Sequence, residues 1–182
     1  MPTDRRPAVF FDRDGTLMED AHYCGDPAMV KVFSGVFEGL RRLKQAGFGV
    51  FIVTNQSGIG RGLITEAQYH AVQEEFLRQA GRDLIDATYY CPDAPGAPSI
   101  CRKPEPGMVL QAAATHHIDL AASYFVGDKS ADIECGRRAG TRTVLVLTGY
   151  GRNQHCEADF TCRDVEEAIN TILATDEHRS AT

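Results

Sequence analysis

The sequence lacks the apolar segments that would direct a chain into or across a membrane. No run approaches the roughly 18–20 apolar residues that a spanning helix needs. The first residues, 1–7, are mostly polar and precede only a short apolar run, so they lack the order of regions typical of a secretory signal. We therefore expect a cytoplasmic protein that does not act at a membrane.

Basic residues are too few for a surface that binds nucleic acid. The chain has 19 lysines and arginines against 25 aspartates and glutamates, a formal net charge of -6. This balance favours neither nucleic acid nor an anionic membrane, and a small molecule is the expected partner. With 182 residues, 43% of them hydrophobic, the chain is long enough for one well-filled core and too short for two ordinary domains. We expect a monomer with one domain over residues 1–182, ordered from about 7 to 175 and followed by a disordered tail.

The cysteines have no pattern typical of a disulfide framework. They are scattered at uneven spacings through a mid-sized chain without an export signal, so we expect reduced thiols that mostly serve in packing. The six are Cys24, Cys91, Cys101, Cys135, Cys156 and Cys162.

Short apolar runs alternate with segments of helical periodicity. Val36, Leu40 and Leu43 recur at three-to-four spacing, and Thr65 with Gln68 marks the start of another helix. The apolar runs are continuous, which is typical of strands buried on both faces of a parallel sheet. We predict a doubly wound α/β fold whose ligand binds beyond the carboxyl ends of the strands. The predicted strands are Ala8–Phe11, Phe48–Val53, Ala87–Tyr90, Tyr124–Val126 and Thr143–Leu147.

A pair of carboxylates follows the first predicted strand. Asp12 and Asp14 precede Gly15, which permits a sharp turn, so both acids can point into one pocket. They could bind a hard cation. A carboxylate beside a metal can also attack phosphorus, because the cation offsets the repulsion between two anions. Taken alone, a solvated acidic turn explains the pair equally well.

Two further clusters are suited to binding a phosphoryl group. Thr54–Gly58, at the end of the second strand, offers a hydroxyl, two amides and backbone N–H groups for phosphate oxygens. Arg102 and Lys103 come just before a helix started by proline, where cations could stabilise a transferring phosphoryl group. Alone, the first is an ordinary polar turn and the second a pair of solvated cations.

A fourth cluster follows the fourth strand. Asp128 could complete a magnesium site with the first carboxylates, and Lys129 could balance charge or touch phosphate. Alternatively, Asp128 could cap the helix that begins near Ser130. All four clusters lie at or just after predicted strands. A purely structural explanation would have to account for each of them separately, so their joint placement favours a single phosphate site.

The four clusters resemble, in order, the motifs of the haloacid dehalogenase (HAD) superfamily of phosphohydrolases. The matching segments are FFDRDGTL, VTNQSGIGRG, CRKPEPGM and VGDKSADIECGRRAG, and the resemblance covers nearly the whole chain. Within the superfamily the motifs look most like those of the subfamily of heptose-bisphosphate phosphatases, which serve lipopolysaccharide synthesis, and histidinol-phosphate phosphatases. The resemblance implies a magnesium-dependent phosphatase with a HAD-like fold. Only one helix is predicted between Asp14 and the second strand, which leaves no room for a separate cap domain.

The resemblance also implies a role for each matching residue. Asp12 would be the nucleophile that forms an aspartyl-phosphate, and Asp14 the general acid and base. Thr54 and Lys103 would bind the transferring phosphoryl group. Magnesium would be held by Asp12, the backbone carbonyl of Asp14 and Asp128. The residues expected near the substrate are Asp20, His22, Tyr23, Asn55, Gln56, Ser57, Arg102 and Lys129.

One loop departs from the pattern of the resembled family. Family members often carry a structural zinc before the position of Lys103, held by a Cys-x-His pair and a Cys-x-Cys pair. Here the corresponding segments are Cys91-Pro92-Asp93 and Ser99-Ile100-Cys101, so two thiols remain. Two thiolates, a carboxylate and a hydroxyl make a poor tetrahedral zinc site. We therefore predict that zinc is absent, and this change leaves the substrate less certain than the chemistry.

Hydrolysis of the 7-phosphate of a heptose 1,7-bisphosphate is the leading hypothesis. The first alternative is the same chemistry on histidinol phosphate or another small ester. A catalytically silent binding protein is disfavoured because both Asp12 and Asp14 are present. Phosphotransfer between sugars needs a cap that excludes water, for which the chain has no predicted segment.

Overall fold

The computed structural model describes residues 5–180, and its centre is a six-stranded sheet in the order β3-β2-β1-β4-β5-β6. All neighbouring strands are parallel, as predicted for a doubly wound α/β fold. The strands are β1 (Ala8–Phe11), β2 (Gly49–Asn55), β3 (Ala87–Cys91), β4 (Tyr124–Gly127), β5 (Arg142–Val146) and β6 (Phe160–Cys162). The α-helices are α1 (Val36–Gln45), α2 (Ser57–Gly60), α3 (Glu66–Ala80), α4 (Gly107–His116), α5 (Ser130–Ala139) and α6 (Val165–Ser180).

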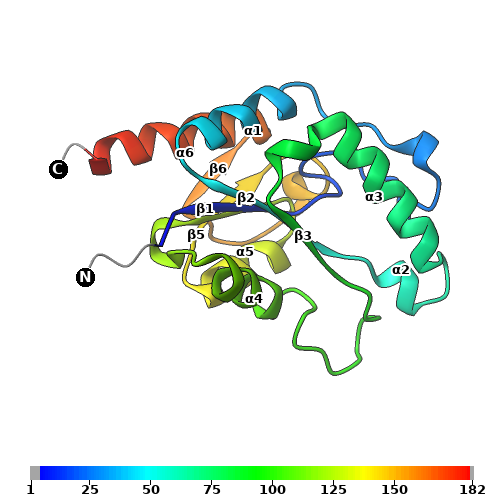
Figure 1. The fold of residues 1–182 in the computed structure, drawn as a ribbon. Helices are drawn as coiled ribbons and strands as arrows, with labels where there is room; N and C mark the ends of the chain where they lie inside the picture. The colour runs from blue at the N-terminus through cyan, green and yellow to red at the C-terminus, as the bar shows by residue number, and fades with distance from the viewer. Residues whose placement is uncertain (1–4, 181–182) are drawn as a thin grey trace.

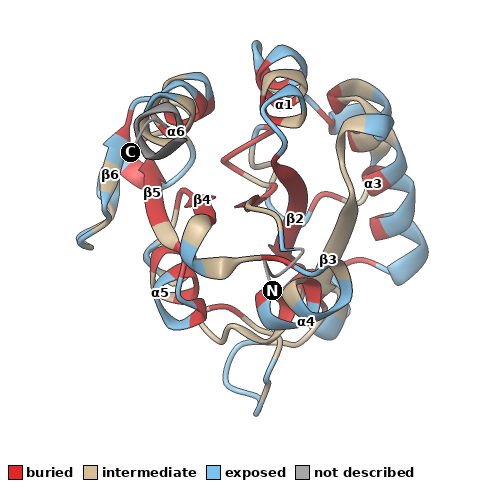
Figure 2. Ribbon diagram, turned by 60° about the vertical axis from the view of Figure 1, so that its left-hand side comes forward, coloured by how far each residue is buried: buried red, intermediate tan, exposed pale blue. Residues whose placement is uncertain are grey.

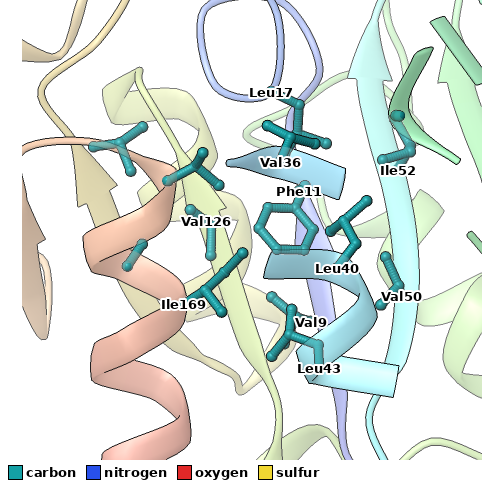
Figure 3. Packing of buried hydrophobic residues seen from close by; sticks show 14 of the residues in the cluster. Val9, Phe11, Leu17, Val36, Leu40, Leu43, Val50, Ile52, Val126 and Ile169 are labelled. Carbon is teal, nitrogen blue, oxygen red and sulfur yellow. The ribbon is translucent and has the colours of Figure 1, made fainter. Parts of the chain in front are cut away.

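Helices cover both faces of the sheet. Helices α1, α3 and α6 lie on one side and α4 and α5 on the other (Figure 1). Strand β1 divides the interior, because alternate side chains of a strand point to opposite faces. Val9 and Phe11 pack with α1, α3 and α6, as Figure 3 shows in part, whereas Ala8 and Phe10 pack with α4 and α5. Two apolar clusters explain why the strands read as continuous apolar runs.

Local signals place the helices as the sequence predicts. The repeat of Val36, Leu40 and Leu43 forms the buried face of α1. Thr65 and Gln68 form a reciprocal capping box at the start of α3, with side chain and backbone bonded in both directions. The central strands and the inward faces of the helices are buried, and the outward faces are exposed (Figure 2). The segment between β1 and β2 holds α1 and one short 3-10 helix, Pro27–Met29, and no separate cap.

The C-terminal part of the chain contains a strand that was not predicted. Strand β6 has three residues and only Cys162 among them is buried, so its apolar signal is weak. The tail from Thr175 was predicted to be disordered, and the structure describes α6 as far as Ser180. The acidic first turn of α6 and the packing of its first half support this helix. The last two residues, 181–182, lie outside the described part of the chain.

Asp86 stabilises the end of the sheet where β2 and β3 begin. Its Oδ2 accepts hydrogen bonds from the backbone N–H of Val50 at 2.7 Å and from Lys44 Nζ at 2.8 Å. Its Oδ1 accepts one from Arg6 Nη2 at 3.2 Å. Burial alone would raise the pKa of Asp86, but the bonds from Lys44 and Val50 outweigh burial and lower it.

We therefore expect Asp86→Asn to lower the free energy of unfolding by roughly 1–3 kcal/mol at pH 7. A carboxyl group whose pKa is lowered by folding stabilises the protein fully at pH values above its unfolded pKa of about 3.9. This stabilisation is lost as the pH falls through the folded pKa. The difference between wild type and variant should therefore shrink below about pH 4. Urea unfolding at several pH values measures it, with the exposed Asp83→Asn as control. Equal stability of wild type and Asp86→Asn at pH 7 would contradict this account.

Candidate active site

The carboxyl ends of the central strands open into a cavity of about 290 Å³. This is where a parallel sheet of this kind is expected to bind its ligand. All eight residues expected near a substrate line this cavity. The lining is Asp14, Asp20, His22, Tyr23, Cys24, Asn55, Gln56, Ser57, Gly58, Arg102, Lys103, Lys129, Ala131 and Tyr150.

A buried ion cluster, here called the floor, adjoins the cavity through Lys103, which is one of the lining residues. The ammonium of Lys103 lies 2.6 Å from Asp12 Oδ1 and 2.7 Å from Asp132 Oδ1. It also donates a hydrogen bond to the carbonyl of Val53 at 2.8 Å. Lys103, Asp12 and Asp132 are 4%, 5% and 1% exposed. Burial of an unpaired charge is unfavourable in free energy, so the ammonium and the two carboxylates stabilise one another in the interior.

Asp128 has one carboxylate oxygen in use and one without a partner. Oδ2 accepts a hydrogen bond from the backbone N–H of Tyr150 at 2.8 Å. Oδ1 is buried and has no hydrogen-bond partner. Single oxygens of Asp12, Asp128 and Asp132 lie within 4.8 Å of one another. Clustered carboxylate oxygens with an unpartnered buried atom fit a hard divalent cation.

The backbone encloses Asp128 closely. A Cβ on Gly15 would lie 2.4 Å from Asp128 Oδ2, and one on Gly149 would lie 2.2 Å from the same atom. Both glycines also have positive φ angles, of 88° and 51°, which other residues rarely adopt. The alternative that Asp128 caps α5 is wrong, because Lys129 is the N-cap residue of this helix. Asp132, in the first turn of α5, accepts the backbone N–H of Lys129 with its Oδ2 at 3.0 Å.

Charge in the floor is unbalanced without a cation. Burial raises the pKa of Asp12 to about 8, although Lys103 opposes this shift. Burial and the charge of Asp132 raise the pKa of Asp128 to about 6. Burial alone would lower the pKa of Lys103, but Asp12 and Asp132 outweigh it and raise that pKa. Three carboxylates share one buried ammonium, so a bound cation would favour their ionised forms.

Asp14 is held by two neighbouring side chains. Arg13 donates from Nε to Oδ2 and from Nη2 to Oδ1, each at 3.2 Å. Gln56 Nε2 donates to Asp14 Oδ2 at 2.8 Å and to Thr54 Oγ1 at 2.9 Å. Thr54, buried at the end of β2, is thereby linked to Asp14 through one amide.

Asn55 holds the loop that carries Lys103. Its side chain donates to the carbonyl of Lys103 at 3.1 Å and accepts from the backbone N–H of Lys103 at 3.0 Å. These paired bonds fix the backbone of Lys103 against the end of β2. The amide of Asn55 is therefore occupied in positioning Lys103, although the residue also lines the cavity.

The rim of the cavity is polar and aromatic. Tyr150 Oη lies 3.1 Å from His22 Nδ1, and the ring of Tyr150 lies 4.8 Å from Lys129 Nζ. Lys129 is 3.5 Å from Asp20 Oδ2. His22 and Tyr23 both have left-handed backbone, with φ angles of 46° and 53°. Such backbone is costly outside glycine and is often found where side chains are aimed at a ligand.

The loop between β3 and α4 contains a disulfide. Cys91 and Cys101 are bonded, with their Cα atoms 5.6 Å apart. The expectation of reduced thiols was wrong for this pair, because the loop returns to the end of β3 and brings the two sulfurs together. Cys24, Cys135, Cys156 and Cys162 are free. Asp93 and the two cysteines could also form a metal-binding group, but the ligand form of cysteine is the thiolate.

Three residues of the site were not assigned a role from the sequence. Asp132 stands four residues after Asp128, a spacing that brings side chains at a helix start to one side. Tyr150 lies in the loop after β5, where no local pattern marks it. Arg13 stands between Asp12 and Asp14 in the sequence, and its partners on α3 are distant in sequence.

Comparison with known proteins gives consistent matches. Residues 100–168 match the HAD-hydrolase-like family model. D-glycero-beta-D-manno-heptose-1,7-bisphosphate 7-phosphatase of Salmonella typhi is 44% identical over 179 residues, covering 91% of this chain and 95% of that protein. The protein of the same name from Escherichia coli K12 is 45% identical over 154 residues, covering 79% and 80%. A crystal structure of D,D-heptose 1,7-bisphosphate phosphatase from B. bronchiseptica, complexed with magnesium and phosphate, has a TM-score of 0.85 at 31% identity, covering 93% of this chain and 99% of that chain.

Among residues 5–180, no helix is both long and apolar enough to span a membrane.

Magnesium binding to the carboxylate cluster should be visible in thermal unfolding. At about 100-fold excess over its dissociation constant, Mg²⁺ should raise the melting temperature of the wild type by roughly 5–10 °C. Asp128→Asn should lose most of this shift. Its melting temperature without metal should not fall, because the substitution removes one of three crowded charges. The exposed Asp83→Asn serves as control, and a full shift in Asp128→Asn would contradict the assignment.

The disulfide predicts the number of reactive thiols. In denaturant without reductant, a chromogenic disulfide reagent should detect only the free cysteines, Cys24, Cys135, Cys156 and Cys162. After reduction it should detect two more, Cys91 and Cys101. Reaction of all cysteines without reductant would show that this pair is not bonded.

Proposed function

We propose that this chain, which belongs to the HAD-like hydrolases and within them to the heptose-1,7-bisphosphate 7-phosphatase family, removes the 7-phosphate of D-glycero-D-manno-heptose 1,7-bisphosphate. The observation that carries the proposal is the ion pair of Asp12 with Lys103, which lines the cavity together with Asp14. The product would serve lipopolysaccharide precursor synthesis.

Asp12 is proposed as the nucleophile. Its carboxylate oxygen attacks phosphorus and the bond to the ester oxygen breaks, which leaves an aspartyl-phosphate. Asp14 gives a proton to the leaving oxygen and then takes one from the water that attacks the phosphoryl group. The bond between Asp12 and phosphorus breaks, and phosphate and free Asp12 are restored. Lys103 and Thr54 lie beside Asp12 and Asp14, where they can bind the phosphoryl oxygens.

The metal proposed for this site is magnesium. Asp12, Asp128 and the backbone carbonyl of Asp14 would hold it, and the unpartnered Oδ1 of Asp128 supports that ligand set. Bound magnesium supplies positive charge, which offsets repulsion between the carboxylate and the phosphoryl group. Asp132 completes the floor by its ion pair with Lys103.

The charge around the cavity favours a substrate with a second anionic group. Burial and the nearby charge of Arg61 lower the pKa of Arg102, so two arginines lie close together. Arg102 Nη1 donates to the carbonyl of Asp93 at 3.0 Å, which directs its side chain along the β3–α4 loop. An anionic 1-phosphate fits these cations better than the cationic amino group of histidinol phosphate does. The other proposed substrate contacts are Asp20, His22, Tyr23, Asn55, Gln56, Ser57 and Lys129.

We also propose that the β3–α4 loop functions without zinc. Its two sulfurs are bonded to each other, and Ser99 Oγ lies 3.5 Å from Cys91 Sγ and 3.4 Å from Cys101 Sγ. Elemental analysis of protein purified without added metal tests this, and stoichiometric zinc would overturn it. A single domain acting as a cytoplasmic monomer completes the proposal.

Phosphate release tests the function directly. We expect magnesium-dependent hydrolysis of heptose 1,7-bisphosphate and much slower hydrolysis of histidinol phosphate. Asp12→Asn should reduce the rate by roughly 10³-fold or more while the fold remains intact. Chelation of the metal should also abolish turnover. Wild-type-like activity of Asp12→Asn would exclude the mechanism, and equal rates on both esters would exclude the proposed substrate preference.

A further inference from the structure

Arg13 is a buried cation that the proposed mechanism leaves without a role. It lies between the two acids of the first motif and is 1% exposed, so its guanidinium has almost no contact with water. A charge buried to this degree must be fully paired to be tolerated. Its partners therefore indicate what it does.

The guanidinium of Arg13 contacts both oxygens of Asp14. Nε donates to Oδ2 and Nη2 donates to Oδ1, at 3.2 Å each. Two parallel bonds from a planar guanidinium fix the plane of a carboxylate as well as its position. A lone aspartate at a turn could instead occupy several rotamers. Gln56 adds one bond to Oδ2 at 2.8 Å, but among the described residues only Arg13 contacts both oxygens and so fixes the plane of the Asp14 carboxylate.

Arg13 is in turn anchored to helix α3. Its Nη1 donates to Gln73 Oε1 at 2.9 Å, and Gln73 Nε2 donates to Thr88 Oγ1 of β3 at 3.1 Å. The guanidinium carbon also lies 5.5 Å from the centre of the Tyr69 ring. Tyr69 and Gln73 are four residues apart on α3, and both are buried. Arg13 thus connects Asp14 to a rigid helix rather than to its own turn.

We propose that Arg13 is the positioning residue for Asp14, holding the carboxylate where it can exchange a proton with the leaving oxygen. This inference rests on the proposed function, in which Asp14 is the general acid and base. A general acid must be within hydrogen-bond reach of the atom it protonates, so its orientation affects the rate directly. The Asp14 side chain is only 17% exposed, and what is exposed faces the cavity.

A comparison of two esters with different leaving groups distinguishes a positioning role of Arg13 from a merely structural one. An alkyl phosphate expels a poor leaving group that needs the proton of Asp14, whereas 4-nitrophenyl phosphate expels a stable phenolate that does not. Arg13→Met should therefore slow the first step with the sugar phosphate by roughly 10- to 100-fold. The same variant should release 4-nitrophenol at a rate within about 3-fold of wild type. Arg13→Lys keeps the charge but not the paired bonds, so it should recover only part of the loss.

The experiment is single-turnover release of each leaving group by wild type and variants. Asp86→Asn is the matched control, since it breaks another partly buried ion pair at the opposite end of the strands. It should change both rates by the same factor. If Arg13→Met does not fold, Gln73→Met decides, because it leaves Arg13 paired with Asp14 but removes the anchor on α3. It should give a smaller loss with the same preference for the aryl ester.

The outcomes separate this inference from the proposed function. Selective loss on the sugar phosphate in the Arg13 variants, or in Gln73→Met where these do not fold, supports positioning. Equal losses on both esters, or the same selectivity in Asp86→Asn, overturn it. Failure of the proposed function would instead appear in the wild type, as no phosphate release from heptose 1,7-bisphosphate.

Discussion

The site depends on one ammonium group, that of Lys103. It joins Asp12 after β1, Asp132 in α5 and the carbonyl of Val53 in β2, so three separate segments meet at one atom. Asn55 fixes the backbone of Lys103 from both sides, which keeps this atom in place. Without the ammonium, Asp12 and Asp132 would remain in the interior without these ion pairs, an arrangement that costs several kcal/mol. In the proposed mechanism, the same charge that stabilises the floor also binds the phosphoryl group.

Much of this arrangement could be predicted from the sequence, because its signals are local. Continuous apolar runs indicated five of the strands, since a strand between two helical layers has no solvent-facing side. The catalytic candidates followed from the topology, because the carboxyl ends of neighbouring parallel strands meet at one edge. Asp12 and Asp128 stand directly after β1 and β4, which pair with each other. Their proximity is a consequence of strand order rather than of sequence distance.

What could not be predicted depends on contacts between distant segments. Arg13 meets Gln73 across 60 positions, and no local pattern indicates such a pairing. The bond between Cys91 and Cys101 depends on the path of a loop that is rich in proline and has no periodic pattern from which its course could be predicted. Tyr150 reaches the rim from a turn after β5, and its role follows from the turn's geometry. Strand β6 lacked a signal because an edge strand buries little side chain.

The enclosure of Asp128 has a consequence for the order in which the protein is made. The carboxylate gets its hydrogen bond from Tyr150, and Thr148 binds the first motif by donating to the carbonyl of Gly15 at 2.7 Å. Both contacts come from a turn that follows five of the six strands in the chain. A growing polypeptide can form its first strands early, but the cluster of acids acquires its final shape only after residue 150 has left the ribosome. The proposed catalytic centre is thus completed only after five strands of the sheet have been synthesised.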